Sequence, residues 1–408
     1  MVALTLIRHA GIPSTEGMSP HDLLIGGAAI VGIAPSCEAP FGLDLAAPAA
    51  GLSVIDATGL TALPGLVDAH VHLTGGGGEA GFKTRVPRRV LSDLVTAGVT
   101  TAVGVLGTDG MTRTMRDLVA TALGLREEGL SAYCYTGNYA VPVVTLTGSV
   151  RDDIVFCDPI LGVGELAISD HRSSQPSLDE FLRLASDAYV AGLAAKKAGI
   201  LHIHLGDGAR GLDLIRRALE VSEIPARVFQ PTHLNRNRRL WAEAKALAAQ
   251  RVASGLPLPY FDVTAFPAED LTGDTMSAAQ AILDWWRAGL PMDCLTISSD
   301  GGGCLPVFDA CGHMTHMGVG RSHTLLETLQ AVVADGMPLA LAAATCTSTP
   351  ARALGLSAKG ALAVGNDADL VLVDETLGLQ TVIARGRVLF HHGALLPAGR
   401  GTFEAEIL

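Results

Sequence analysis

The chain has 408 residues, of which 49% are hydrophobic and only 4% aromatic, and its formal net charge is −12 from 29 basic and 41 acidic residues. This length suits a (β/α)8 barrel with an accessory module, and the apolar content argues against a disordered chain. The acidic balance and the lack of a basic stripe argue against nucleic acid as a partner.

Cysteine usage and the N-terminus together predict a cytoplasmic protein with no membrane partner. The seven cysteines are scattered and form no Cys-x-x-Cys pair, which favours a reducing compartment. The N-terminus turns polar at Arg8, too early for a signal peptide. No apolar run approaches the roughly 20 residues that span a bilayer.

The two ends of the chain are predicted to form one small β-sandwich domain, residues 1–62 with residues 359–408. Both ends contain short β-like pieces between Gly-containing turns. These pieces are residues 22–25, 29–33, 369–373, 381–384 and 388–391.

Between the ends, short apolar runs alternate with helical patterns. Fully buried parallel strands appear as nearly continuous apolar runs, and eight such repeats predict an α/β fold with a closed TIM-like barrel over residues 63–358. The clearest helix begins after Ser177, which forms a capping box with Glu180, and Gly199 lies past its end. The predicted strands are residues 66–73, 100–106, 131–135, 160–168, 200–205, 227–231, 260–265 and 294–298.

The first predicted strand ends in a His-x-His pair, His70 and His72. Side chains at positions i and i+2 of a strand point the same way, so two imidazoles could hold one metal ion. This pair alone is a weak signal, because two hydrogen-bonded structural histidines would look the same.

Further residues suited to metal binding follow at the ends of later strands, where barrel active sites lie. Glu165 lies on a predicted apolar strand, and burying a carboxylate there costs free energy unless a cation lies close by. Imidazoles with carboxylates suit Zn2+ or a similar divalent ion. The candidate ligands are His70, His72, Glu165, His204, His233 and Asp300, with His202 as a competing histidine on the fifth strand.

At these motifs the sequence resembles the amidohydrolase superfamily and, within it, the isoaspartyl dipeptidase family. The resemblance covers nearly the whole chain. The runs that carry it are residues 64–73, 75–79, 106–109, 145–150, 167–173, 231–237 and 298–300.

The resemblance implies two divalent metal ions that share a bridging hydroxide. One ion takes His70, His72 and Asp300, the other takes His204 and His233, and His202 is left as a structural histidine. The family usually has a carboxylated lysine at the position of Glu165. We therefore expect Glu165 to bridge both ions directly, with no need for carbon dioxide; the alternative is that it binds one ion or none.

The resemblance also implies a site for a small β-aspartyl dipeptide. Glu79 would hold the α-amine, Arg172 and Arg236 would hold the carboxylates, and Thr108 would add a hydroxyl. Tyr139 would polarise the scissile carbonyl, and Asp300 would transfer the proton. Cys304 stands where the family has a serine and is a weaker donor. The open alternatives are surface ion pairs for the two arginines and a loop-tip charge for Glu79.

Rival activities are hydrolysis of a cyclic amide, as in hydantoinases and dihydroorotases, hydrolysis of an N-acyl amino acid, or a deaminase with one metal. A cyclic amide has no free α-amine and would leave Glu79 without a role. A non-catalytic scaffold is a further alternative, which the full set of ligand residues argues against. The resemblance implies a homo-oligomer.

Overall fold

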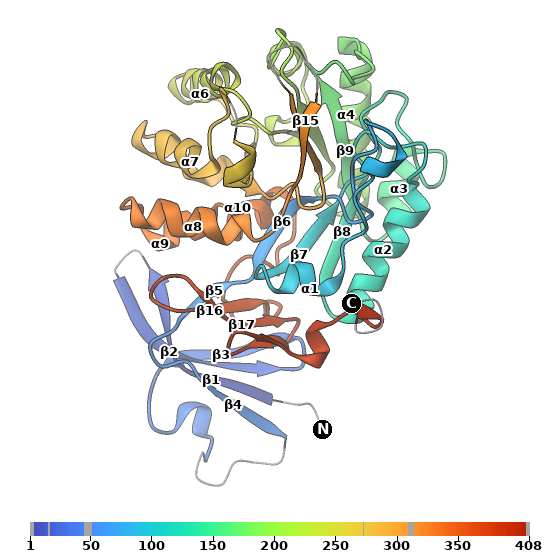
Figure 1. The fold of residues 1–408 in the computed structure, drawn as a ribbon. Helices are drawn as coiled ribbons and strands as arrows, with labels where there is room; N and C mark the ends of the chain where they lie inside the picture. The colour runs from blue at the N-terminus through green and yellow to red at the C-terminus, as the bar shows by residue number, and fades with distance from the viewer. Residues whose placement is uncertain (1–3, 15–16, 45–50, 272, 309–313, 405–408) are drawn as a thin grey trace.

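The computed structural model describes residues 4–14, 17–44, 51–271, 273–308 and 314–404. Eight parallel strands follow one another around a barrel, which confirms the predicted fold class (Figure 1). The first six strands of the barrel pair with one another in chain order, and the last two pair with each other. A bridge from Val71 to Gly301 joins the first strand of the barrel to the end of the last. The strands are β6 (Leu66–Val71), β7 (Val99–Gly104), β8 (Ser131–Thr136), β9 (Ile160–Ile168), β10 (Ile200–Leu205), β11 (Phe229–Thr232), β12 (Phe261–Thr264) and β13 (Leu295–Ser298).

The barrel strands are covered on both faces, so nearly all of their residues are buried, and this explains the continuous apolar runs in the sequence. Helices cover the outside of the barrel (Figure 1). The capping box of Ser177 and Glu180 is confirmed at the start of α4. The helices are α1 (Leu91–Val95), α2 (Met115–Glu128), α3 (Val150–Phe156), α4 (Leu178–Ala195), α5 (Asp213–Val221), α6 (Arg238–Ala253), α7 (Ala278–Arg287), α8 (Thr324–Ala334), α9 (Leu339–Ala344) and α10 (Ser348–Ala353).

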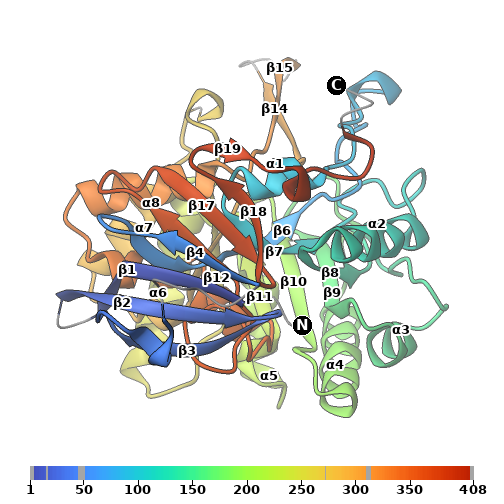
Figure 2. The same ribbon diagram turned by 90° about the horizontal axis from the view of Figure 1, so that it is seen from below.

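Strands from both ends of the chain form one sheet below the barrel, where the N-terminal and C-terminal strands lie side by side (Figure 2). The junction is β5, which pairs antiparallel with β16, and residues from both ends share one apolar core that includes Ile25 and Leu370. The strands are β1 (Leu4–Ser14), β2 (Gly17–Gly26), β3 (Ala29–Pro35), β4 (Leu52–Asp56), β5 (Thr61–Pro64), β16 (Leu370–Val373), β17 (Leu379–Ala384), β18 (Arg387–His391) and β19 (Ala394–Leu395).

Sheet membership changes between Pro64, the last residue of β5, and Leu66, the first residue of β6. The domain boundaries drawn from the sequence stay a prediction. A hairpin of β14 (Cys304–Phe308) and β15 (Met314–Val319), which follows the last barrel strand, was not predicted. Within the described ranges, no helix has both the length and the apolar character needed to cross a bilayer.

Candidate metal centre and substrate pocket

The six predicted ligand side chains lie together inside one rim of the barrel. Each is at or just beyond the carboxyl end of its strand, except Glu165, which lies within β9. All six are buried, with exposed fractions between 0% and 7%. Residues from five strands therefore meet because parallel strands of a closed barrel end at the same rim.

Glu165 is at the centre of this cluster, and its two oxygens face different groups. Its Oε1 lies 3.4 Å from His70 Nε2 and 3.6 Å from His72 Nε2. Its Oε2 lies 3.2 Å from His204 Nδ1 and 3.5 Å from His233 Nε2. The ligand atoms within each of these two groups lie within 4.8 Å of one another, which is a suitable arrangement for a metal ion.

Asp300 completes the first group. Its Oδ1 is 3.1 Å from His72 Nε2 and 3.5 Å from His70 Nε2. Three buried atoms face one another here, and none of them has a hydrogen-bond partner among the described residues: His70 Nε2, Glu165 Oε1 and Asp300 Oδ1. Buried polar atoms are rarely left without partners, so this donor set fits a divalent cation.

The electrostatics of the cluster also favour a cation. Burial by itself would lower the pKa of His70, but Glu165 and then Asp300 raise it to about 9. Burial would likewise raise the pKa of Glu165, yet His70, His204 and His233 hold it well below its usual value. Glu165 is therefore an anion deep inside the protein, where an anion needs positive charge close by.

A bulge in β9 brings the short Glu165 side chain to the centre. Val163 pairs with Leu201 and Leu166 with Ile203, so Gly164 and Glu165 together lie opposite His202. A β-bulge redirects a side chain in this way. A Cβ atom on Gly164 would come within 2.8 Å of His202 Cβ, so the bulge requires a glycine beside Glu165.

His202 does not join either group of ligands; it contacts the far side of His70. Its Nε2 is 2.8 Å from His70 Nδ1, and its Nδ1 is 3.3 Å from Gln230 Oε1. With that amide oxygen as the acceptor, His202 Nδ1 would carry the proton, its Nε2 would accept from His70 Nδ1, and His70 Nε2 would be left to bind a metal. Such partners orient a ligand and raise its basicity.

We therefore expect His202→Ala to weaken metal binding by about 10- to 100-fold without unfolding the protein. The affinity can be measured by competition with a chromophoric chelator. The matched control is His392→Ala, which replaces an exposed histidine in the turn between β18 and β19. An unchanged affinity would show that His202 only fills space.

A pocket of about 560 Å³ opens above the metal centre. It brings together every residue predicted to face the substrate. Four of the six ligand residues also reach its wall, so a bound molecule would contact the metal centre directly. The predicted residues in its wall are Glu79, Thr108, Tyr139, Arg172, Arg236 and Cys304, with the ligands His72, His204, His233 and Asp300.

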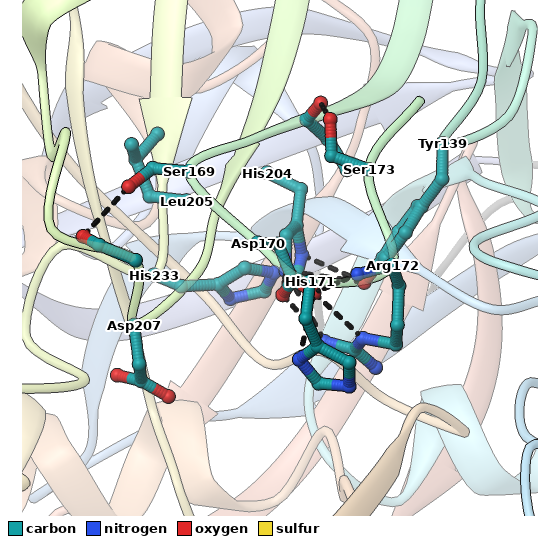
Figure 3. A network of polar contacts seen from close by, with 12 residues as sticks. Tyr139, Ser169, Asp170, His171, Arg172, Ser173, His204, Leu205, Asp207 and His233 are labelled. Carbon is teal, nitrogen blue, oxygen red and sulfur yellow. Dashed lines mark hydrogen bonds and ion pairs between the residues drawn. The ribbon is translucent and has the colours of Figure 1, made fainter. Parts of the chain in front are cut away.

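Arg172 is held between two carboxylates at the pocket wall. Figure 3 shows its pairing with one of them, Asp170. Its guanidinium forms two hydrogen bonds to Asp170, at 3.0 and 2.8 Å, and its Nη1 donates to Glu79 Oε1 at 3.2 Å. Thr108 also donates to Glu79, at 2.8 Å. A surface ion pair was the open alternative for Arg172, but its pair with Asp170 lies in the pocket wall.

Asp170 was not predicted as a site residue, although it lies in the run that carried the family resemblance. Its Oδ2 is 2.9 Å from His204 Nε2, so it contacts a candidate ligand and Arg172 at once. Its neighbour in the pocket, Asp207, pairs with Arg236 at 3.1 and 3.0 Å. No periodicity distinguishes such acids from surface charges in a sequence.

Tyr139 and Cys304 both line the pocket. The Tyr139 hydroxyl is 2.7 Å from His204 Nδ1, and burial holds the pKa of Tyr139 well above its usual value. Burial also raises the pKa of the Cys304 thiol to about 12, so Cys304 is a neutral thiol near pH 7 and a poor nucleophile. Its Sγ contacts Met317 Sδ from β15.

The barrel and its metal-binding site define an amidohydrolase, and the model described as "Amidohydrolase family" matches residues 61–389. The chain belongs to this family and is a hydrolase. It is 39% identical to beta-aspartyl dipeptidase from Fervidobacterium islandicum AW-1 in complex with beta-Asp-Leu dipeptide, over 96% of this chain and 98% of that chain, with a TM-score of 0.86. The resemblance to isoaspartyl dipeptidases is thereby confirmed.

More distant structures share the fold alone. Dihydropyrimidinase from Brevibacillus agri NCHU1002 is 16% identical over 96% of each chain, with a TM-score of 0.62. A D-hydantoinase is 17% identical over 98% of this chain and 97% of that chain, with a TM-score of 0.65.

Proposed function

We propose that the protein hydrolyses the side-chain amide bond of β-aspartyl dipeptides and releases aspartate and the second amino acid. The observation that carries this proposal is the ion pair of Glu79 and Arg172, which lies in one pocket with the metal-ligand side chains. The beta-Asp-Leu dipeptide in the similar Fervidobacterium islandicum structure supports the same class of substrate.

A β-aspartyl group carries an α-amine and an α-carboxylate on one carbon, close to the amide to be cleaved. An anion and a cation 3.2 Å apart match this zwitterion. The substrate would replace the internal pair with two pairs of its own, its amine with Glu79 and its carboxylate with Arg172. Thr108 would add a hydroxyl, and Arg236 would bind the carboxylate of the leaving amino acid.

We further propose that two divalent ions occupy the metal centre and that Zn2+ suits it best. Glu165 would bridge them, because its two oxygens face the two groups of ligands. When bound, the ions polarise the substrate carbonyl and lower the pKa of a water molecule towards neutrality. One ion would take His70, His72 and Asp300, and the other would take His204 and His233.

Two residues of the chain would take part in the chemistry. The Tyr139 hydroxyl keeps its proton at neutral pH and would donate a hydrogen bond to the oxyanion that forms on the amide carbonyl. The Asp300 carboxylate would accept a proton from the attacking water and deliver it to the leaving nitrogen. Cys304 would contribute to the shape of the pocket and form no covalent intermediate.

A matched panel of substrates tests the proposal: β-Asp-Leu, α-Asp-Leu, hydantoin, dihydroorotate and N-acetyl-leucine, with metal content measured on the same sample. We expect kcat/KM for β-Asp-Leu to exceed that for each other compound by roughly 100-fold or more, because a site with charged partners penalises a substrate that leaves them unpaired. Faster turnover of a cyclic amide or of N-acetyl-leucine would contradict the proposal and reassign the substrate class. A homo-oligomer and a cytoplasmic location stay predictions.

A further inference from the structure

The run of four glycines before Glu79 forms a loop that lies against residues 84–87. A Cβ atom on Gly75 would come within 1.9 Å of the Val86 carbonyl oxygen, and one on Gly77 within 2.5 Å of the Thr84 carbonyl oxygen. Both glycines also have positive φ angles, of 80° and 77°. Close approach of two backbone segments therefore requires glycine at these positions.

A loop of this kind has few side chains with which to fix its own shape, and glycine-rich backbone loses more conformational entropy on ordering than other sequences. The position of Glu79, directly after the run, consequently depends on contacts from elsewhere in the chain. The bridge between Gly77 and Arg85 is one such contact, and the hydrogen bond from Val86 to the Gly76 carbonyl is another.

Arg113 supplies further contacts from outside the loop. Its side chain is 4% exposed, and it reaches the glycine loop from the segment that follows β7. Its Nε donates to the Thr74 carbonyl at 3.1 Å, and its Nη2 donates to the carbonyls of Gly76, at 3.1 Å, and Val86, at 2.8 Å. Its Nη1 donates to Asp109 Oδ2 at 3.0 Å.

One buried guanidinium thus joins the two loops that meet at the Thr108–Glu79 hydrogen bond. Thr74 and Gly76 belong to the loop that carries Glu79, and Asp109 is the neighbour of Thr108. Arg113 itself is not among the residues that line the pocket, so it would act through Glu79 and not on a bound molecule. The planar guanidinium can donate to several carbonyls in different directions at once, whereas the single ammonium of a lysine cannot reach them all.

We propose that Arg113 is a positioning residue that holds Glu79 in place to receive the α-amine of the substrate, and so sets the preference for substrates with a free α-amine. This inference rests on the proposed function, in which Glu79 binds that amine. Charged partners act at full strength only when they are held in place beforehand, and small displacements reduce their effect strongly.

A purely structural role for Arg113 predicts a different result. If Arg113 only stabilised the fold, its loss would reduce the turnover of all substrates equally or unfold the barrel. If it positions Glu79, the loss affects substrates that carry an α-amine and spares those that lack it. N-succinyl-leucine is β-Asp-Leu without the α-amine, so the pair of compounds isolates this contact.

The test compares wild type, Arg113→Ala and Arg113→Lys on β-Asp-Leu and N-succinyl-leucine. We expect wild type to prefer β-Asp-Leu by roughly 10- to 100-fold in kcat/KM. In Arg113→Ala this preference should fall by about tenfold, mainly because KM for β-Asp-Leu rises. The kcat/KM for N-succinyl-leucine should change by less than about threefold. Arg113→Lys should be intermediate, because it keeps the charge but loses the planar guanidinium.

Controls separate positioning from folding. Arg88→Ala removes an exposed arginine that pairs with Asp117 and should leave the preference unchanged. Melting temperature and metal content of each variant are measured, and millimolar methylguanidinium should restore part of the preference to Arg113→Ala. An equal loss for both substrates, or a preference that stays as in wild type, overturns the role of Arg113. A wild-type enzyme that hydrolyses neither compound overturns the proposed function and this inference with it.

Discussion

Replacing Glu165 by glutamine is expected to abolish the proposed binuclear centre. Glutamine has nearly the same shape, but its neutral amide offers only one oxygen and no charge between the two groups of histidines. We expect metal content to fall by at least one ion per chain. Loss of metal assistance worth several kcal/mol should reduce kcat/KM on the order of 10³-fold or more. Metal analysis and steady-state kinetics on β-Asp-Leu measure both effects.

The matched control is Glu220→Gln, the same change at an exposed position of α5. Because Glu165 already carries a carboxylate, bicarbonate should change neither the metal content nor the activity of wild type. An increase of metal content with bicarbonate would contradict direct bridging by Glu165. Full occupancy in Glu165→Gln would show that the histidines and Asp300 hold both ions unaided.

The second large effect is expected from Asp300→Asn, which should lower kcat. Asparagine preserves the shape of the side chain but cannot accept and return a proton, so kcat should fall by about 10²- to 10⁴-fold, the usual contribution of a general acid–base. Asp300 also faces His70 and His72, so we expect weaker metal binding as well. Kinetics at saturating metal separate the two effects, because added metal restores occupancy but not proton transfer.

Asp213→Asn, at an exposed position at the start of α5, serves as the control for Asp300→Asn. Circular dichroism establishes that both variants are folded. An Asp300→Asn enzyme with wild-type kcat would show that another group moves the proton. Asp170 would then be the next residue to replace, because it lies in the pocket wall and contacts His204.

The protonation state of the buried groups limits what other chemistry the pocket can perform. The raised pKa of Cys304, about 12 and caused by burial, leaves almost no thiolate at neutral pH. The raised pKa of Tyr139 has the same cause and keeps the phenol as a donor. A covalent route through either side chain would need the anion that burial disfavours.

The sequence predicted the fold well and made the candidate ligands stand out, for a simple physical reason. Parallel strands that are buried on both faces appear in the sequence as nearly continuous apolar runs. A polar residue within such a run, such as His204 or Glu165, therefore stands out, because burying it is costly without a partner. Chain order then places successive strand ends around one rim. The eight strands follow from these patterns and are confirmed. The small β domain built from both ends of the chain was predicted from the short β-like pieces there, and the structure has strands of both ends in one sheet.

Contacts that depend on register and loop packing were beyond the reach of sequence patterns. The sequence showed that Glu165 is shorter than the lysine usual at its position, but only the bulge at Gly164 explains how its oxygens lie between two groups of histidines. The partner of His202 likewise depended on the distance between two strands that are far apart in the sequence.

The sequence by itself therefore determined the barrel, the family and the six candidate metal-ligand residues, because each depends on residue types and their order along strands. Only the tertiary structure decided how Glu79, Arg172 and Arg113 are arranged, because each lies in a connection outside the barrel strands. Such connections have no periodicity, and the partners of their charged side chains are set by the packing of one loop against another.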